Sequence, residues 1–342
     1  MPIADMVPMT TSLRLSSSRG YDAKGRGWQG GPDWPSRGDM KAFIFPGQGS
    51  QVVGMGKALA DASPHAREVF GEVDEALGQS LFRLMTEGPD ETLTLTENAQ
   101  PAIMANAIAT LRVLEREGGM RLADKAAFVA GHSLGEYTAL CAAGAIDLAT
   151  TARLLKTRGQ AMQAAVPDGV GAMAVVLGLD FDAVTALAVE AAQGEVCAIA
   201  NDNGGNQVVI SGHLEAITRA MRLARDQGAK HVITLPVSAP FHCPLMAPAQ
   251  PVMAEALATA RIQAPLVPLY ANVTAAPVVD PAEIVRLLVA QVTAMVRWRE
   301  TVIALCDAGV TEFVEFGGKV LIMIMAIPIL AALMDIITKL IA

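Results

Sequence analysis

The stretch AAFVAGHSLG, residues 126–135, contains the step from a strand to a helix on which the expected fold depends. Its first half is a short run of small apolar residues, which suits a strand that is buried on both faces of a sheet. The run ends at Gly131, and a helical pattern follows over residues 136–165. The sequence therefore predicts a strand, a tight turn and a helix in immediate succession.

Two further segments repeat this arrangement near the two ends of the chain. Residues 43–45 are an apolar run that leads into Gly47-Gln48-Gly49, and residues 312–316 are another that ends at Gly317-Gly318. Short apolar strands that end in glycine and alternate with helices, such as residues 99–116, are typical of a parallel sheet covered by helices. We therefore expect an α/β core.

The middle of the chain follows a different order. Strand-like and helical segments alternate there in six pieces: 171–177, 180–192, 195–200, 207–211, 214–227 and 231–235. Their order, β-α-β-β-α-β, is that of a ferredoxin-like unit. The sequence therefore predicts a small ferredoxin-like α+β insert at residues 167–236, within a larger α/β domain formed by residues 40–166 and 237–320.

Ser133 stands at the centre of the pattern G-x-S-x-G, directly after the strand and before the helix. Glycines permit the strained turn that lifts a serine hydroxyl away from the sheet, which is the arrangement of a nucleophile elbow. The N–H groups at the start of the following helix can hold a developing oxyanion. The pattern thus favours Ser133 as a nucleophile over an incidental serine in a turn.

A serine nucleophile needs a base, and histidine is the usual one. The chain has five histidines: His65, His132, His213, His231 and His242. His132 is adjacent to Ser133, but successive residues in an elbow point in different directions. His242 lies between Pro240 and Pro244, in an irregular loop just after the predicted insert, and such a braced loop can present a side chain to a cleft. We therefore expect His242 to be the base.

Composition excludes several classes of function. Hydrophobic residues make up 52% of the 342 residues and the formal net charge is −8, so the chain can bury a large core and is a poor candidate for nucleic-acid binding. The four cysteines form no C-x-x-C pair, which argues against a zinc site or a disulfide framework and favours a reducing cytoplasm.

The two ends of the chain depart from the pattern of the core. Residues 1–39 are rich in Gly, Ser, Pro and Arg and lack the apolar segment of a secretory signal, so we expect them to be a disordered extension. Every residue from Val320 to Met334 is apolar, and Pro328 interrupts the run. Fifteen apolar residues are short for a membrane span, so we expect residues 321–342 to be an atypical apolar segment in which packing is favoured over membrane contact.

Three motifs in this order resemble the malonyl-CoA:acyl carrier protein transacylase family. They are Phe45-Pro46-Gly47-Gln48-Gly49-Ser50-Gln51, then Gly131-His132-Ser133-Leu134-Gly135-Glu136-Tyr137, then Gln207-Val208-Val209-Ile210-Ser211-Gly212. The resemblance runs from about Met40 to Val320. It implies an α/β-hydrolase-like parallel sheet with a ferredoxin-like insert, in agreement with the order of elements above.

The resemblance also implies roles for individual residues. The family's serine nucleophile and histidine base correspond to Ser133 and His242, and its oxyanion-binding N–H groups to those of Gln48 and Leu134. Its malonyl-binding arginine corresponds to Arg158, which would otherwise be taken for a cation on a helix surface. The glutamine whose backbone carbonyl orients the histidine corresponds to Gln291, and residues near the cleft correspond to Asn201, Asn203 and Phe241.

The implied activity is transfer of a malonyl group from coenzyme A to an acyl carrier protein, for fatty acid synthesis. Malonyl-CoA would be a substrate, and no permanently bound cofactor is expected. Two alternatives stay open. An esterase- or thioesterase-like hydrolase would need an acid between Ser133 and His242, for which Asp202 and Asp226 are available. A non-catalytic module that docks a carrier protein is the other.

Overall fold

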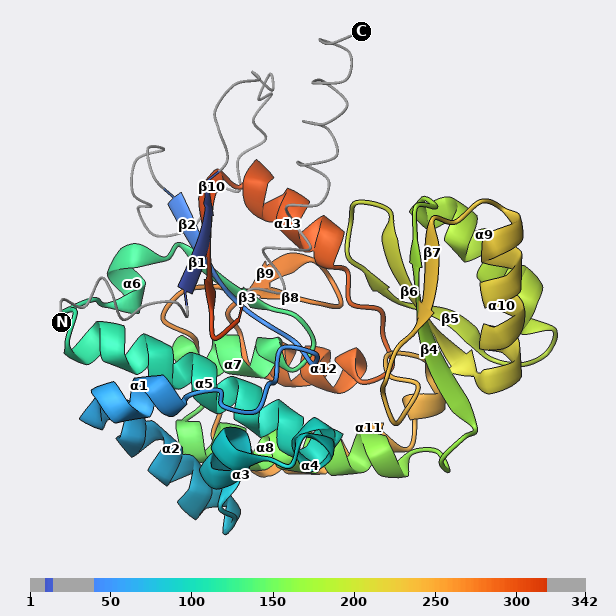
Figure 1. The fold of residues 1–342 in the computed structure, drawn as a ribbon. Coiled ribbons are helices and arrows are strands. Elements are labelled where there is room, and N and C mark those ends of the chain that lie inside the picture. Colours follow the sequence, from blue (N-terminus) through green and yellow to red (C-terminus); the bar gives the residue numbers. More distant parts are fainter. Residues whose placement is uncertain (1–9, 15–39, 319–342) are drawn as a thin grey trace, which may run out of the picture.

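The computed structural model describes residues 10–14 and 40–318, which form a large helix-covered sheet and a smaller sheet beside it (Figure 1). Residues 1–9, 15–39 and 319–342, which include the apolar segment 321–342, lie outside this description. Within the described residues, none of the helices combines the length and the apolar character that crossing a bilayer requires.

The large sheet has the strand order β1-β10-β2-β3-β8-β9. Its strands are β1 (Thr10–Arg14), β2 (Met40–Phe45), β3 (Phe128–Gly131), β8 (Leu269–Ala271), β9 (Ala276–Val278) and β10 (Val310–Phe316). The four central strands β10, β2, β3 and β8 are parallel, and an antiparallel strand closes each edge. The expected parallel α/β core is therefore present.

Helices cover both faces of this sheet. The helices of the large domain are α1 (Lys57–Ala62), α2 (Pro64–Leu77), α3 (Leu81–Glu87), α4 (Asp90–Thr94), α5 (Thr96–Arg116), α6 (Leu122–Lys125), α7 (Gly135–Ala142), α8 (Leu148–Ala164), α11 (Ala249–Thr259), α12 (Pro281–Gln291) and α13 (Trp298–Asp307), with a 3₁₀ turn at Pro244–Met246. Side chains of β2 alternate between the faces, because successive residues of a strand point to opposite sides. Phe43 and Phe45 pack with α5 and α7, whereas Ile44 packs with Trp298 of α13.

The small sheet is antiparallel, with the order β5-β6-β4-β7. Its elements are β4 (Gly171–Leu177), α9 (Phe181–Ala192), β5 (Cys197–Asp202), β6 (Gln207–His213), α10 (Leu214–Asp226) and β7 (His231–Thr234). The two helices pack on one face of the sheet around a separate apolar core. This is the order of elements expected for the insert.

The small sheet is joined to the large domain beside the loop that follows α12. Asn201 of β5 forms a parallel bridge with Val296, and the Val296 N–H donates to the Ala200 carbonyl at 2.8 Å. Asp202 adds an ion pair with Arg299 at 2.7 Å. One end of β5 is therefore held against the large domain.

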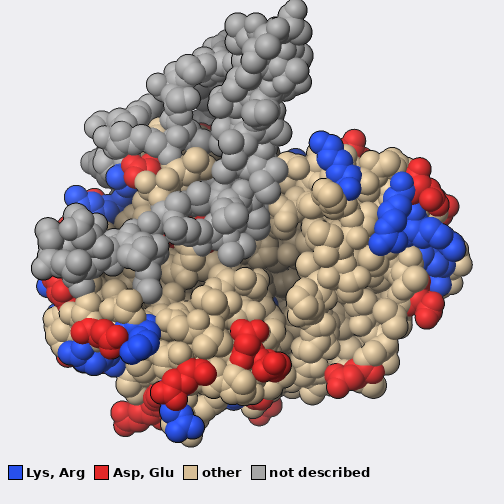
Figure 2. Space-filling model, viewed as in Figure 1, with Lys and Arg blue, Asp and Glu red and all other residues tan. Residues whose placement is uncertain are grey.

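Charged side chains are unevenly spread over the surface. On the face drawn in Figure 2, Lys and Arg gather over the side of the small sheet that carries α9 and α10. Helix α10 carries Arg219, Arg222 and Arg225 together with Glu215 and Asp226, and Arg219 pairs with Glu195 at 2.6 Å. Basic and acidic side chains are therefore interleaved on this part of the surface.

Two expectations need correction. Residues 136–165 are two helices, because Gly144, with a φ of 72°, ends the first and Asp147 caps the second by accepting the Thr150 N–H at 2.7 Å. Thr10–Arg14, within the segment expected to be disordered, form a strand that pairs antiparallel with β10. The edge of β10 offers unpaired backbone groups, and β1 satisfies them.

Candidate active site

The turn between β3 and α7 places Ser133 at the carboxyl edge of the large sheet. Its φ is 55°, a left-handed conformation that non-glycine residues rarely adopt. The neighbouring glycines leave no room for side chains: a Cβ at Gly131 would lie 1.9 Å from the Gly135 carbonyl oxygen, and one at Gly135 would lie 2.2 Å from that of Phe45. The predicted elbow is therefore present and tightly enclosed.

His242 faces Ser133 from the loop that follows the small sheet. Its Nε2 lies 2.7 Å from Ser133 Oγ, and its Nδ1 lies 3.0 Å from the Gln291 carbonyl oxygen and 3.1 Å from that of Ala294. Two carbonyl acceptors require the proton on Nδ1, so Nε2 is the acceptor for the serine hydroxyl. The backbone of His242 is also left-handed, with a φ of 56°.

Burial keeps His242 neutral. It lowers the pKa of His242 to about 3, and the positive charge of Arg158 adds to this effect. The same cause lowers the pKa of His132 to about 4. A neutral imidazole with a free Nε2 lone pair is the form that can accept a proton from Ser133.

Arg158 enters the site from α8, and its side chain is almost completely buried. Its Nη1 donates to Gln100 Oε1 at 2.9 Å, and its Nη2 donates to Gln291 Oε1 at 2.9 Å and to Ser133 Oγ at 3.1 Å. Burial lowers the pKa of the guanidinium, and Tyr137 and Glu136 partly offset this. Among the described residues, Arg158 Nε has no hydrogen-bond acceptor.

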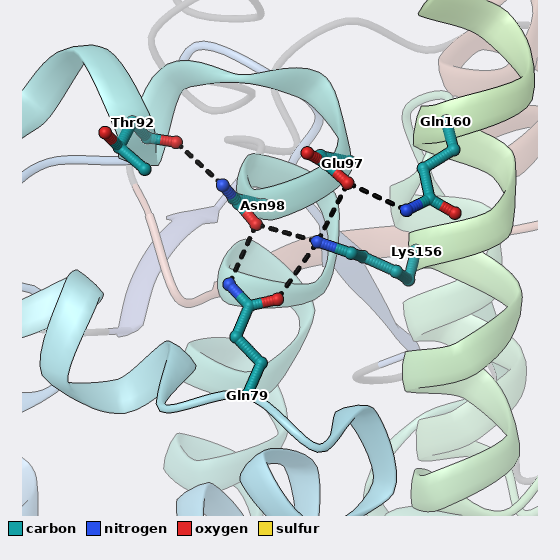
Figure 3. A network of polar contacts seen from close by, with 6 residues as sticks. All are labelled: Gln79, Thr92, Glu97, Asn98, Lys156 and Gln160. Atoms are coloured by element: carbon teal, nitrogen blue, oxygen red, sulfur yellow. Dashed lines mark hydrogen bonds and ion pairs between the residues drawn. The ribbon is translucent and has the colours of Figure 1, made fainter.

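A network of polar contacts fixes the part of α8 that carries Arg158 (Figure 3). Lys156 Nζ donates to Gln79 Oε1 and Asn98 Oδ1, both at 3.0 Å, and pairs with Glu97 at 2.9 Å. The hydrogen bond from Lys156 holds the pKa of Glu97 below its ordinary value. Gln160 donates to the same carboxylate at 2.9 Å, so α8 is tied to the start of α5 two residues before and after Arg158.

Ser133, His242 and Arg158 line one small cavity of about 90 Å³ between the large domain and the small sheet. Gln48 and Leu134 line it too, and neither of their N–H groups has an acceptor in the described part of the chain. Two free N–H groups beside Ser133 Oγ fit an oxyanion hole. A larger cavity of about 510 Å³, beside Cys141 and Arg112, contains neither Ser133 nor His242.

Of the three residues expected near the cleft, Asn201, Asn203 and Phe241, two line the cavity and one does not. Asn201 and Phe241 line the cavity. Asn203 Oδ1 instead accepts a hydrogen bond from His132 Nε2 at 3.0 Å, and Asn203 is not part of the cavity wall. The imidazole of His132 thus contacts Asn203 and Asn201 of the small domain, and His132 lines the same cavity as Ser133.

Three polar residues of the site were not identified from the sequence. They are Gln100, which holds Arg158, and Glu136 and Asn272, which lie buried beneath the elbow. Burial raises the pKa of Glu136 to about 7, although hydrogen bonds from Gln291 and Asn272 act in the opposite direction. Asn272 follows β8 directly, and a polar residue at the carboxyl end of a parallel strand was the available signal.

Comparison with known proteins agrees with this geometry. Residues 42–323 match the model of the acyl transferase domain. The malonyl CoA-acyl carrier protein transacylase of Escherichia coli K12 is 44% identical over 82% of this chain and 90% of its own length. The structure of an acyl-carrier-protein S-malonyltransferase from Bartonella henselae has a TM-score of 0.82 and 51% identity, covering 84% of this chain and 92% of that one.

A further solved structure shows a malonyl-transacylase in complex with a type II polyketide synthase acyl carrier protein. It has a TM-score of 0.80 and 39% identity, and covers 85% of this chain and 93% of that one. The matched family model spans the elbow, the small sheet and the strands of the large sheet other than β1. On sequence, fold and the arrangement of the serine, the histidine and the arginine, the chain belongs to the acyltransferase family.

Proposed function

We propose that this enzyme transfers the malonyl group of malonyl-CoA to the phosphopantetheine thiol of acyl carrier protein, through a malonyl-serine intermediate, and so supplies fatty acid synthesis. The buried Arg158, 3.1 Å from the nucleophile and with an Nε–H that no acceptor in residues 10–14 and 40–318 pairs, is the observation that carries this proposal. Malonyl differs from acetyl by one carboxylate, and a buried carboxylate requires a paired cation.

The first half-reaction forms the ester. His242 Nε2 takes the proton of Ser133 Oγ, which attacks the thioester carbonyl. The N–H groups of Gln48 and Leu134 hold the oxyanion, and the carbonyls of Gln291 and Ala294 hold the Nδ1 proton of the imidazolium. The C–S bond then breaks, and the coenzyme A sulfur leaves with the proton from His242.

The second half-reaction reverses the roles of thiol and serine. The phosphopantetheine thiol gives its proton to His242 and attacks the malonyl ester carbonyl. The bond to Ser133 Oγ breaks, and His242 returns the proton to this oxygen. Each proton transfer uses the one imidazole, so the chain's own residues complete the reaction with malonyl-CoA as substrate and no resident cofactor.

The hydrolase alternative has less support. Such an enzyme would place an acid on His242 Nδ1, where this structure has the two carbonyls. Asp202 is engaged with Arg299 instead. The non-catalytic alternative does not account for a serine, a histidine and an arginine within hydrogen-bond distance of one another.

We further propose the division into domains and the location of the enzyme. Residues 40–166 and 237–320 would form an α/β-hydrolase-like catalytic domain, and 167–236 a ferredoxin-like subdomain; the antiparallel order β5-β6-β4-β7 supports the latter. Free cysteines at positions 141, 197, 243 and 306 support a cytoplasmic enzyme. Membrane contact through residues 321–342 is not part of the proposal.

Intact mass spectrometry after incubation with malonyl-CoA tests the central step. The wild-type chain should gain one malonyl group, and Ser133→Ala should gain none. Adding a thiol acceptor should then release the group to the thiol faster than to water. An adduct that persists on Ser133→Ala would show that the nucleophile is another residue.

A further inference from the structure

The backbone of Ser133 adopts an energetically unfavourable conformation. Its φ of 55° lies in a region that costs a non-glycine residue about 1–3 kcal/mol, and such a conformation persists only where the surroundings enforce it. The flanking glycines allow the turn but do not hold it. Something else must keep the hydroxyl directed at His242.

The side chain of Asn272 bridges this turn. Its Oδ1 accepts the Ser133 N–H at 2.8 Å, and its Nδ2 donates to the Gly131 carbonyl at 2.6 Å. One planar amide thus supplies an acceptor and a donor to two backbone groups on either side of His132. Gln291 Nε2 donates to the backbone carbonyl oxygen of Ser133 at 2.9 Å.

Asn272 is itself held rigidly. It follows β8, which pairs with β3 in the register Val129 to Leu269 and Ala130 to Tyr270. Its N–H donates to Glu136 Oε2 at 3.3 Å, its carbonyl accepts the Arg297 N–H at 3.1 Å, and the residue is completely buried. Its amide therefore cannot turn away without leaving buried polar groups unpaired.

We propose that Asn272 is a positioning residue, whose amide holds the strained backbone of Ser133 so that Oγ stays directed at His242. The proposal rests on the assignment of Ser133 as the nucleophile. Asn272 does not line the cavity, so it acts through the serine and not on the substrate.

Asn272→Ala should lower kcat by about 10- to 100-fold, because the turn loses both bonds that enforce it. KM for malonyl-CoA should stay within about threefold, because Arg158 and the cavity wall are unchanged. Asn106→Ala is the matched control. Asn106 is also buried and also donates from Nδ2 to a backbone carbonyl, that of Gly317 at 3.0 Å, but neither Asn106 nor Gly317 lines the cavity. It should retain wild-type kcat per folded molecule.

Asn272→Asp gives a readout that a merely structural role would not move. A carboxylate keeps the acceptor for Ser133 but lacks the donor for Gly131, whereas a protonated carboxyl has both. The activity ratio of Asn272→Asp to wild type should therefore rise as the pH falls from about 8 to about 5.5, since burial beside Glu136 raises the pKa of the introduced group. His132, His242, Glu136 and Arg158 are present in both proteins, so their own titration largely cancels in the ratio.

Several outcomes separate the explanations. If wild type is labelled by malonyl-CoA and Asn272→Ala retains kcat within twofold, the positioning role is wrong while the proposed function stands. A loss of kcat in Asn106→Ala equal to that in Asn272→Ala would also overturn the positioning role of Asn272. If Asn272→Ala does not fold, a flat pH ratio for Asn272→Asp would reject the proposal by itself. Absence of labelling in wild type would instead reject the proposed function.

Discussion

Arg158 is a buried cation whose direct hydrogen-bond partners are neutral. Gln100, Gln291 and Ser133 accept from its Nη groups, and Glu136 lies one step further away, behind Gln291. A buried charge is stabilised best by an opposite charge in contact with it. The site thus holds a guanidinium that a substrate carboxylate can neutralise, which relates the proposed choice of malonyl to one side chain.

Replacing Arg158 should change the choice of substrate. Losing one partner of a buried charge pair typically costs about 2–5 kcal/mol, so Arg158→Ala should lower kcat/KM for malonyl-CoA by about 30- to several-thousand-fold. Acetyl-CoA brings no carboxylate, so its transfer should hold or rise. Arg158→Lys should recover only part of the activity, because an ammonium lacks the planar fork.

The ratio of kcat/KM for malonyl-CoA and acetyl-CoA measures this effect. Arg153→Ala is the control, because Arg153 lies on the same helix but is exposed. Its ratio should equal that of wild type. An unchanged ratio in Arg158→Ala would assign malonyl selection to another residue, with Phe241 in the cavity wall the next candidate.

The residues of the site differ in how far the sequence could identify them. Ser133 and His242 follow from local patterns, a glycine-flanked serine after a strand and a histidine braced by prolines. Gln100 carries no local pattern, and Asn272 carries only its place after a strand, because their roles depend on which helix and strand lie next to the elbow. Asn203 was assigned to the cleft from the family resemblance; its side chain contacts His132, which lines the cavity, although Asn203 itself does not.

At the scale of elements, the contacts of Lys156 should stabilise α8 without selecting the substrate. Lys156→Met removes an ion pair and two hydrogen bonds at a partly buried site, so the free energy of unfolding should fall by about 1–3 kcal/mol. Arg158 keeps its own partners, so the ratio of malonyl to acetyl transfer should stay within about twofold. Urea denaturation and the kinetic ratio test the two parts. A shift of the ratio as large as that of Arg158→Ala would contradict the separation.

Strand β1 gives a second prediction at this scale. Removing residues 1–39 takes away the partner of β10 and exposes its edge, which favours association between molecules. In the sheet, β10 and β2 separate β1 from β3, the strand that leads to Ser133, so kcat per folded molecule should stay near that of the full chain. Light scattering and kinetics of the truncated and full chains check this. A truncated chain that is inactive yet folded and monomeric would show that β1 affects the site.

For the whole molecule, the sequence predicted the central strands better than the helix boundary at Gly144 or the pairing of the edge strand. Apolar runs ending in glycine identified β2, β3 and β10, because buried parallel strands have few other sequences available. The sequence did not predict the break between α7 and α8 at Gly144 or the pairing of β1 with β10. The first depends on a short cap signal inside a long helical pattern, and the second on an edge 300 residues away in the chain, which local periodicity does not report.

The buried ionisable groups make the stability of the whole molecule depend on pH. Burial lowers the pKa of His132 to about 4 and that of His242 to about 3, from an ordinary value of 6.5. Between pH 6.5 and about pH 4, both histidines are protonated in the unfolded chain and neutral in the folded chain, so acid favours unfolding. Glu136 acts oppositely: its pKa is raised from 4.5 to about 7, so the folded chain binds a proton first.

From about pH 6.5 to about pH 4.5, these three groups together should bind about one proton more in the unfolded chain than in the folded chain, and by themselves should lower the free energy of unfolding by about 1.4 kcal/mol per pH unit as the pH falls. Glu136→Gln keeps an acceptor for Gln291 but removes the opposing titration, so its slope should be steeper by about a further 1.4 kcal/mol per pH unit. Urea denaturation of both proteins at several pH values measures the two slopes, and groups that titrate in both cancel in the comparison. Parallel slopes would mean that Glu136 is already ionised in the folded chain across this range, and that hydrogen bonds from Gln291 and Asn272 outweigh its burial.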